Sequence, residues 1–192
     1  MKVSRAQAAQ NRERIVDVAA RLFRERGYDG IGVADLMHGA GLTHGGFYGH
    51  FASKQDLLTE ACRRGADASV ERWRRLRDAA PDQALSQIIA SYLSPAHRDG
   101  PGQGCTVAAL GADVARLSTS ARDMMTKGIE DQIAILAGLM RDGTDHERRA
   151  QAVAAYATMV GAMVLARAVG APALSDEILQ AAAARLKDDA AR

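Results

Sequence analysis

The side chains best suited to chemistry in this chain are imidazoles and thiols. They are His38, His44, His50, His97, His146, Cys62 and Cys105. Their spacings match no zinc-ligand motif, and no nucleophile, base and orienting group are arranged for catalysis. The sequence also contains no phosphate-binding loop and no dinucleotide fingerprint. We therefore expect no catalytic residues, no metal and no cofactor, and binding is the chemistry that remains.

Three of these histidines lie between residues 33 and 58, where the pattern predicts a helix-turn-helix. Val33 and Met37 recur at helical spacing and mark the apolar face of a short helix. The Gly-Ala-Gly run at 39–41 ends that helix, because glycine tolerates the backbone of a tight turn. Thr43 is suited to cap the next helix, since its hydroxyl can accept a backbone N–H. This arrangement presents a recognition helix to the major groove of DNA.

The expected helix after the turn has two different faces. Phe47 and Phe51 are four residues apart and share one side. We assign both to packing, because a domain this small needs large apolar side chains to close its core. His44 and Tyr48 share another side. His44 is a candidate contact to a base or a phosphate, and His50 is either a contact or a support for the helix.

The residues of this region resemble the TetR-type (TetR/AcrR-like) family of one-component transcriptional regulators. The similar motifs are Ala40-Gly41-Leu42-Thr43, Phe47-Tyr48, His50-Phe51, Ser53-Lys54 and Asp56-Leu57-Leu58. The similar residues of the first helix and its closing glycine are Ile15, Ala19, Leu22, Phe23 and Gly27-Tyr28. The resemblance is close from about Arg12 to Leu58, and beyond Leu58 only the length and the helical pattern are similar. It implies an N-terminal three-helix DNA-binding domain joined to a larger helical domain for ligand binding and dimerisation.

The resemblance also implies which residues bind DNA. They are Val33, Thr43, His44, Gly45, Gly46, Phe47, Tyr48, His50 and Lys54. By analogy to the family motif, Tyr48 and Lys54 bind phosphates, and Thr43 and His44 lie nearest the bases. Two such heads in a dimer, about 34–36 Å apart, would read a palindromic operator in successive major grooves.

Two features depart from the family pattern. Gly32 stands where members usually have Thr or Ser, so the second helix lacks the hydroxyl that would cap it. The expected recognition helix carries Gly45, Gly46 and Gly49, and each glycine costs a helix about 1 kcal/mol relative to Ala. Either this helix is partly disordered until DNA is present, or its backbone approaches the duplex unusually closely.

Composition and charge fit a DNA-binding protein of the cytoplasm. The chain has 192 residues, enough for a small head and a larger helical body, and 47% of them are apolar. The two cysteines make no disulfide framework and the N-terminus lacks an apolar signal core, so a reducing cytoplasm is expected. Residues 1–54 carry eight Lys and Arg against five Asp and Glu, whereas residues 55–192 carry 17 against 18. The positive end is therefore where DNA is expected.

The helical pattern continues to the end of the chain, so the expected fold is all-α with about nine helices. A first helix starts near Arg5 or Asn11 and ends at Gly27, and a long helix capped by Ser53 runs to about Ala79. Further helices are expected at 83–96, 105–117, 120–141, 145–169 and 175–187, the last one capped by Ser175, with a loop at 97–104. We expect two domains, a helix-turn-helix domain at 1–52 and an effector-binding and dimerisation domain at 53–192.

The segment 150–169 is apolar on every face and rich in alanine. Between its polar flanks it is shorter than the roughly 20 apolar residues of a membrane span, so we expect no contact with a membrane. A soluble helix this apolar must be buried all round, with one side on its own core and the other on a second subunit. In the family, the last two helices of each chain pair across a two-fold axis. The residues expected in this homodimer interface are Ala157, Gly161, Leu165, Ile178 and Leu179.

The resemblance implies a small-molecule effector, whose identity the sequence does not give. The residues that could line its pocket are Trp73, Tyr92, Cys105, Met125, Tyr156 and Met159. For each of them, filling of the core is the alternative. Cys105 follows Gly104 at an expected helix N-terminus, where the helix dipole favours a thiolate, so it could sense electrophiles or oxidants. The alternative for Cys105 is a small buried hydrophobe, and we assign Cys62 to packing.

Together these features predict a ligand-responsive, DNA-binding transcriptional regulator that is not an enzyme. Repression is the usual mode of the family, in which a dimer binds the operator DNA and a small molecule releases it. The alternative is an all-α small-molecule-binding protein whose glycine-rich head binds DNA weakly or without specificity.

Overall fold

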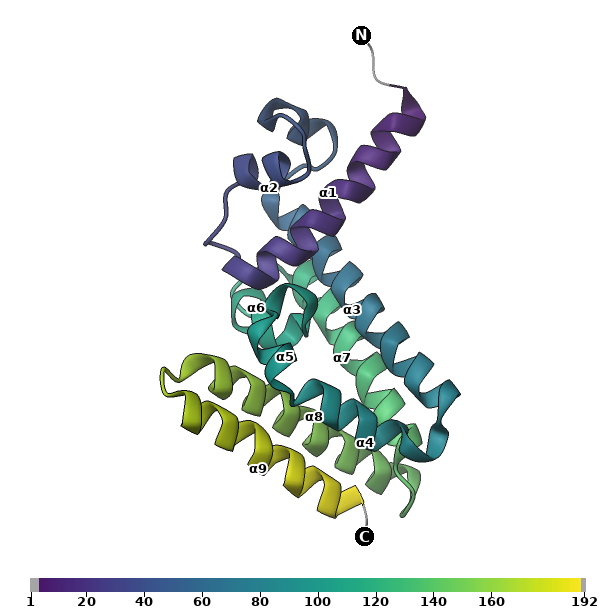
Figure 1. Cartoon of the computed structure of the whole chain (residues 1–192). Coiled ribbons are helices and arrows are strands. Elements are labelled where there is room, and N and C mark those ends of the chain that lie inside the picture. Colours follow the sequence, from purple (N-terminus) through teal and green to yellow (C-terminus); the bar gives the residue numbers. More distant parts are fainter. Residues whose placement is uncertain (1–3, 191–192) are drawn as a thin grey trace.

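The structure of the protein is a computed structural model that describes residues 4–190, which form helices joined by short connections (Figure 1). The helices are α1 Arg5–Arg26, α2 Val33–Gly39, η1 His44–Gly49, α3 Lys54–Ala79, α4 Pro81–Tyr92, α5 Pro95–Asp99, η2 Pro101–Gln103, α6 Thr106–Val114, α7 Thr119–Leu139, α8 Asp145–Ala168 and α9 Pro172–Ala190. The label η marks a short 3₁₀ helix. Residues 4–190 contain no strand, so the all-α prediction is confirmed.

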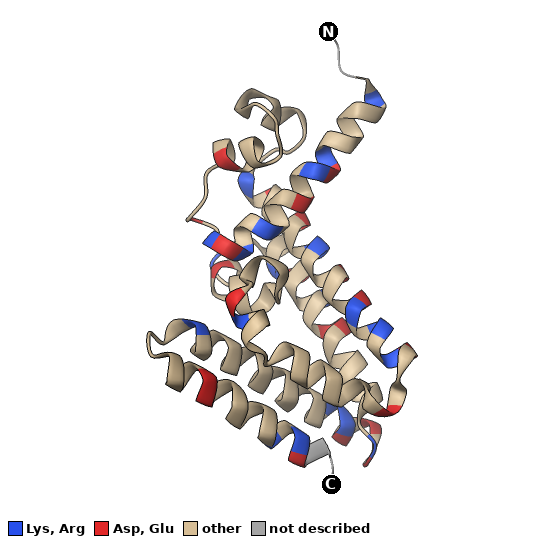
Figure 2. Ribbon diagram, in the orientation of Figure 1, with Lys and Arg blue, Asp and Glu red and all other residues tan. Residues whose placement is uncertain are grey.

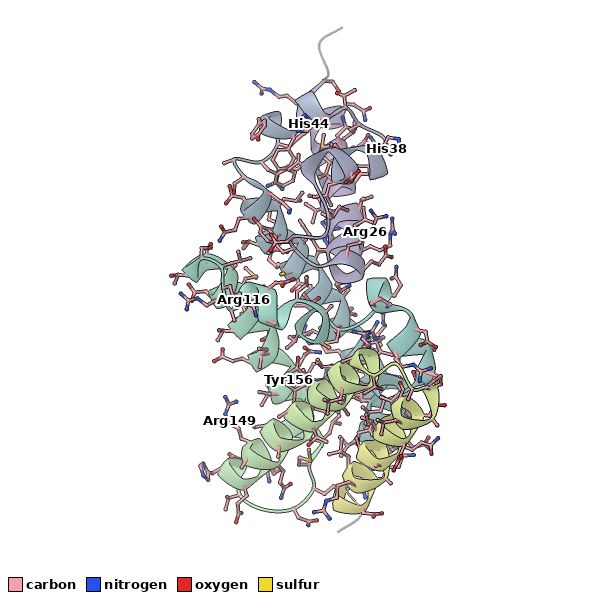
Figure 3. The ribbon with its side chains drawn as sticks, turned by 90° about the vertical axis from the view of Figure 1, so that its left-hand side faces the viewer. Arg26, His38, His44, Arg116, Arg149 and Tyr156 are labelled. Carbon is pink, nitrogen blue, oxygen red and sulfur yellow. The ribbon has the colours of Figure 1, made fainter. Side chains whose placement is uncertain are left out.

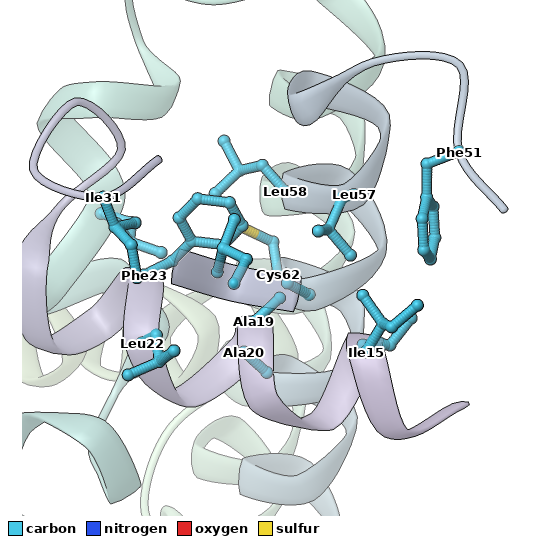
Figure 4. Close-up of a cluster of buried hydrophobic side chains, with 14 of the residues drawn as sticks. Ile15, Ala19, Ala20, Leu22, Phe23, Ile31, Phe51, Leu57, Leu58 and Cys62 are labelled. Carbon is cyan, nitrogen blue, oxygen red and sulfur yellow. The ribbon is translucent and has the colours of Figure 1, made fainter. Parts of the chain in front are cut away.

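The N-terminal elements form a small head around one core (Figure 4). Helix α1 packs on α3 and on α2, and α2 packs on η1. Ile15, Phe23 and Phe47 are fully buried in the core that these elements share. Ser53 begins α3 as predicted, because its hydroxyl accepts the N–H of Asp56 at 3.0 Å. The head is therefore held by a shared apolar core and a capped connecting helix.

Helix α3 connects the head to the body. Its 26 residues span about 39 Å at a rise of about 1.5 Å per residue. Leu57 lies in the head core, whereas Val70 and Trp73 lie in the body core. The head core also includes Leu110 of α6, so apolar packing continues across the expected domain boundary at residues 52 and 53. We retain that boundary as a proposal about chain organisation, and the packing shows that the two parts share a core at their junction.

The body is built from layers of helices around α7 and α8. Helix α7 packs between α3 and α8, and α8 packs on α9, while α4 lies across α3 and α9 (Figure 1). The fully buried residues of this second core include Ile88 of α4, Leu136 of α7 and Met159 of α8. The predicted helices of the body are thus present, with end positions that differ by up to four residues, and two of these shifts have a clear structural cause.

The first shift is at the end of α4. This helix stops at Tyr92, not at residue 96, because Ser94 caps a new helix by accepting the N–H of His97 at 3.2 Å. Pro95 then occupies the first helical position, where its missing N–H has no cost. The expected loop at 97–104 is therefore wrong, since α5 and η2 occupy most of it.

The second shift is at the start of α9, where the predicted Ser175 cap is wrong. Helix α9 begins at Pro172, and Ser175 is a buried residue inside its first turn. The Ser175 hydroxyl donates to the carbonyl of Ala166 at 2.7 Å and accepts from Arg98 Nη1 at 3.0 Å. This serine therefore connects α9 to α8 and α5, a role that depends on contacts distant along the chain.

Helix α8 is long and apolar enough to cross a membrane by length and composition alone, a test that core helices of soluble proteins also pass. Its Ala152, Tyr156, Met159 and Met163 are buried between α7 and α9. Its other face is exposed in the single chain. The expectation that one side of this helix packs on the core of its own chain is confirmed. The other side is not covered by the described residues of the single chain.

Candidate nucleic-acid interface

The segment that resembles a recognition helix is η1, and it is a single short 3₁₀ helix rather than the α-helix expected. Three of its six residues are glycine, which lowers the stability of a regular helix. Thr43 occupies the N-cap position, but within the described residues its hydroxyl receives no capping hydrogen bond. The predicted Thr43 cap is therefore correct in position and wrong in its hydrogen bond.

The exposed side of η1 carries an imidazole and a phenol. Tyr48 is 71% exposed, His44 and Thr43 are also exposed, and His44 lies at the end of the molecule far from the body (Figure 3). Phe47 is fully buried, and its ring lies 5.2 Å from that of Tyr48 and 5.7 Å from that of Phe51. The Phe47 ring is thus part of the core, and its place among the side chains expected to touch DNA is wrong.

The other residues expected at DNA surround η1. Val33 and His50 are half-buried, and the His50 ring packs beside Phe51 at 6.4 Å between ring centroids. Lys54 Nζ lies 4.3 Å from the centroid of the Tyr28 ring, a cation–π contact that positions the ammonium. Val33 thus begins α2, His50 follows η1 and Lys54 begins α3, and their contact with DNA stays a prediction.

The glycines of η1 are not required by the chain itself. No described atom beyond their own neighbours lies within 4 Å of a Cβ built on Gly45 or Gly49, and Gly46 meets only Met37 Cε at 3.6 Å. None of the three has a positive φ, in contrast to Gly41 in the preceding turn, whose φ is 70°. The described chain therefore leaves room for a side chain at Gly45 and Gly49.

Charge on this surface comes from its flanks, not from η1. Residues 44–49 include no Lys, Arg, Asp or Glu, and Figure 2 shows the segment uncoloured while α1 and the start of α3 carry basic residues. At α2, the N-cap Gly32 has no side chain, and the Asp35 carboxylate accepts the Gly32 N–H at 3.4 Å. Hydrogen bonds from His44, Tyr48 and Thr43 are thus the side-chain contacts that η1 itself can offer to DNA.

Two arginines form ion pairs that connect α1 to α3. Arg12 forms a bidentate ion pair with Glu60, one bond of which is 2.8 Å, and its guanidinium lies 4.8 Å from the centroid of the Phe51 ring. Arg64 pairs with both Glu13 and Asp17. The charge of Arg12 is therefore compensated within the chain.

The residues expected to line an effector pocket are mostly brought together in the body. Trp73 packs edge-on against Tyr92 at 6.4 Å and against Tyr156 at 6.3 Å, and Cys105 and Met159 belong to the same core cluster. Met125 lies instead in the head core, so its assignment to the same pocket is wrong. The five grouped side chains are packed against one another, and each is at most 4% exposed.

A buried polar network that was not predicted from the sequence adjoins these aromatic residues. The Tyr156 hydroxyl donates to Gln132 Oε1 at 2.8 Å, and Gln132 Nε2 donates to the Ser69 hydroxyl at 3.1 Å. Burial, followed by the neighbouring Cys105, raises the pKa of both Tyr92 and Tyr156. The Tyr92 hydroxyl is buried and has no hydrogen-bond partner in the described part of the chain. A glutamine on the apolar face of α7 was the available signal in the sequence.

Cys105 lies at the N-cap of α6, as expected from the sequence, but its thiol is buried. Its exposed fraction is 2%, and its backbone N–H donates to His97 Nε2 at 2.9 Å. A reactive cysteine is usually partly exposed, so this environment favours packing over sensing. Cys62 is also buried, and burial raises the pKa of its thiol to about 12, which agrees with its assignment to packing.

The exposed face of α8 carries an apolar stripe. Val153, Ala157, Val164 and Leu165 are exposed, and a Cβ added at Gly161 would meet no described atom within 4 Å beyond its own neighbours. On α9, Ile178 is half-buried. Leu179 is 2% exposed and packs in the core of its own chain, so the expectation that Leu179 lies in a dimer interface is wrong.

Comparison with known proteins agrees with this geometry. A family model described as bacterial regulatory proteins of the tetR family matches residues 15–61, which include α2, η1 and the start of α3. The transcriptional repressor NemR of Escherichia coli (strain K12) is 28% identical over 166 residues, covering 81% of this chain and 83% of NemR. The transcriptional repressor KstR2 of Mycobacterium tuberculosis (strain ATCC 25618 / H37Rv) is 36% identical over 94 residues, or 47% of each protein.

Solved structures extend the similarity to the whole fold. The crystal structure of E. coli NemR in its reduced form has a TM-score of 0.79 and 26% identity, covering 93% of this chain and 96% of that one. A tetR-family regulator from Agrobacterium tumefaciens has a TM-score of 0.76 at 22% identity. The relatives are transcriptional regulators rather than enzymes. The helix-turn-helix motif, the helical body and these relatives together show that residues 15–61 match the tetR family of bacterial regulatory proteins and that the chain is homologous to transcriptional repressors of that family.

Proposed function

We propose that this protein is a cytoplasmic repressor that binds a palindromic operator as a homodimer and is released from it by a small molecule. The observation that carries the proposal is the surface of η1. Thr43, His44 and Tyr48 are exposed on a segment whose other face, at Phe47, is fully buried in the head core. A rigid support beneath exposed hydrogen-bonding groups is what reading of a DNA groove requires.

The roles of the individual residues follow from their positions. Tyr48 and Lys54, at the edge of η1 and the start of α3, would bind phosphates, with Val33, Gly45, Gly46 and His50 lining the same surface. Thr43 and His44 would lie nearest the base edges. Phosphate contacts supply affinity and orientation, and the few base contacts supply sequence preference.

The dimer is supported by the apolar stripe on α8. Its Ala157, Gly161 and Leu165 recur every four residues, so they share one helix face, and small residues let a second helix approach closely. Exposed apolar residues in a contiguous patch usually mark an interface. Pairing of two chains through this face, with Ile178 at its margin, would give the two heads that a palindrome needs.

The effector would act in the body, on the cluster of Trp73, Tyr92, Cys105, Tyr156 and Met159. The buried Tyr92 hydroxyl, which lacks a partner among residues 4–190, could receive a polar group of the effector. Because this cluster is packed, a ligand that enters it must displace side chains. Trp73 lies on α3, so the displacement would move the helix that carries the head and lower the affinity of that conformation for the operator.

The test is selection of genomic DNA fragments by the purified protein at moderate salt. We expect recovery of a short palindrome, and the same selection with the variant His44→Ala should lose base preference at that position while retaining salt-sensitive binding. Recovery only of salt-sensitive DNA without a shared sequence would contradict the proposal. It would support a small-molecule-binding protein with a non-specific head, an alternative to which the short glycine-rich η1 gives weight.

A further inference from the structure

A cavity lies where the head meets the body. It has a volume of about 450 Å³, and its lining comes from α1, from α3 and, at the end of η2, from Gln103 and Gly104. Four of its lining residues are arginines, namely Arg21 and Arg24 of α1 and Arg64 and Arg72 of α3, and the lining includes one carboxylate, that of Asp17. A cavity with four guanidinium groups attracts anions.

Two of these guanidinium groups are already paired. Arg64 binds Glu13 and Asp17, and Arg21 binds Glu25 at 3.1 Å. Their charges are compensated within the chain, so they contribute little net attraction for an anion. The excess positive charge of the cavity therefore comes from the other two arginines.

Arg24 and Arg72 have no carboxylate partner among residues 4–190. Arg24 donates to the carbonyl of Gly102 through Nε at 3.1 Å and through Nη2, while its Nη1 is buried without a hydrogen-bond partner in this part of the chain. Arg72 makes one long hydrogen bond, to the Ser69 hydroxyl at 3.4 Å. Burial, and the positive charge of Arg72, both lower the pKa of Arg24. Arg24 is half-buried and Arg72 is exposed. Partial burial of the Arg24 guanidinium without a counterion is costly, and a bound anion would reduce that cost.

The absence of a side chain at Gly65 leaves room for Arg24 Nη1 beside the cavity. A Cβ added at Gly65 of α3 would lie closer than 3.0 Å to both Arg24 Nη1 and Thr106 Oγ1. The Thr106 hydroxyl is buried and, like Arg24 Nη1, lacks a partner within the described residues. Two hydrogen-bonding groups without partners thus meet over a residue with no side chain, beside the cavity that Gly65 itself lines.

We infer that this cavity binds the oxyanion group, phosphate or carboxylate, of a small-molecule ligand, with Arg24 and Arg72 as the residues that hold it. Planar guanidinium groups bind both kinds of oxyanion through paired hydrogen bonds. We do not assign the phosphates of the DNA backbone to this cavity, because η1 lies at the far end of the head. Figure 3 shows Arg26, at the end of α1, well separated from His44.

The position of the cavity gives the ligand a route to regulation, a step that rests on the proposed function. An oxyanion held by Arg24 and Arg72 would tie α1, which belongs to the head, to α3 and the end of η2. Ser69, which lines the cavity, is also hydrogen-bonded through Gln132 to Tyr156 of α8. Occupancy would thus act on both the orientation of the head and the helix proposed to form the dimer.

The experiment is a titration of the purified protein with sodium pyrophosphate, and separately with sodium acetate, in a chloride buffer of fixed ionic strength. Calorimetry and the shift of the melting temperature report binding. We expect saturable binding of at least one of the two anions. Removal of one charge-assisted hydrogen bond should weaken it about tenfold in Arg24→Met and in Arg72→Met. Arg75→Met removes the same charge from an exposed site on α3 outside the cavity and should change binding less than about twofold.

Arg72→Met keeps the test informative if Arg24→Met fails to fold, because Arg72 makes only the one long hydrogen bond. Binding of neither anion, or equal weakening in Arg75→Met and Arg72→Met, would overturn the inference. Binding of pyrophosphate alone would identify a phosphate site, and binding of acetate would identify a carboxylate site. Operator selection is measured independently, so saturable anion binding with no palindrome recovered would reject the proposed function and leave the anion site standing.

Discussion

Lys54, which we propose to bind a DNA phosphate, makes a cation–π contact with the ring of Tyr28. The Lys54 ammonium lies 4.3 Å from the ring centroid, which positions the charge while its N–H groups can still donate to a phosphate. The motif around Lys54 was recognisable in the sequence. The partner Tyr28, 26 positions earlier, was assigned only to the end of the first helix, because nothing local indicates what a ring will pack against.

For this reason we expect Lys54→Ala to weaken binding to all DNA sequences alike. The slope of log affinity against log salt should fall by about one unit, because one phosphate is no longer neutralised by a lysine. Filter binding or fluorescence anisotropy over a series of salt concentrations measures both quantities. Lys127→Ala, an exposed lysine of the body, is the control and should leave the slope unchanged. An unaltered slope in Lys54→Ala would exclude the phosphate role.

His97 should make the stability of the protein depend on pH. Its Nε2 accepts the Cys105 N–H at 2.9 Å, so Nδ1 carries the proton and donates to the carbonyl of Tyr92 at 2.6 Å. Burial is the main cause that lowers the pKa of His97 below its ordinary value of 6.5, and the charges of Arg167 and Arg72 act in the same direction.

The unfolded chain therefore binds this proton more tightly than the folded chain. The contribution of His97 to stability is complete above its ordinary pKa and is lost as the pH falls through its folded pKa. We expect the free energy of unfolding to decrease from about pH 7.5 to about pH 5.5, and to decrease less in His97→Gln. Denaturant titrations at the two pH values measure this difference. Equal pH dependence in the two proteins would show that another group is responsible.

Among the elements, η1 differs most from its expectation. The turn, the aromatic pair and the Ser53 cap were all predictable, because each depends on residues at most four apart. Whether the segment would be an α-helix or a 3₁₀ helix was not, since Gly45, Gly46 and Gly49 weaken either form. The structure adds that the chain leaves open space around Gly45 and Gly49. The sequence left two explanations for these glycines, partial disorder without DNA and close approach of the backbone to DNA. The open space agrees with the second explanation.

Gly49→Ala tests that explanation at the level of the element. We expect the free energy of unfolding to rise by about 0.5–1 kcal/mol, because Ala restricts the unfolded chain and meets no neighbour in the folded one. Operator affinity should fall, because the added methyl group would occupy the space that DNA needs. Gly138→Ala, on α7 and equally open, should stabilise the protein without affecting DNA binding. Unchanged operator affinity in Gly49→Ala would contradict close approach of the backbone.

At the scale of the whole molecule, the exposed face of α8 is the feature that a single chain leaves unexplained. The sequence showed that this helix is apolar on every side, and the structure separates the side that packs on α7 and α9 from the side that faces outward. The structure corrects the prediction for Leu179, because this residue is buried in its own chain. Ala157, Gly161 and Leu165 remain in the interface that we propose.

A charge placed on this face should separate the subunits. We expect Leu165→Glu to sediment as a monomer at micromolar concentration and to bind the operator more weakly, because a single head makes half the contacts. Ala79→Glu adds the same charge at an exposed site at the end of α3 and should remain a dimer. Analytical ultracentrifugation of both variants beside the wild type measures this. A wild-type protein that sediments as a monomer would count against the proposed dimer as a whole.

The sequence by itself determined the all-α class, most helix positions, the Ser53 cap and the helix-turn-helix motif, because apolar periodicity, capping residues and glycine turns act over a few neighbouring residues. It also predicted the resemblance to the tetR family and the end of the molecule that we propose to bind DNA. Only the tertiary structure decided that Ser175 lies inside a helix, that Met125 belongs to the head core, and that Arg24 and Arg72 share a cavity without a counterion among residues 4–190. Each of these depends on contacts between residues far apart in the chain, which no local pattern encodes.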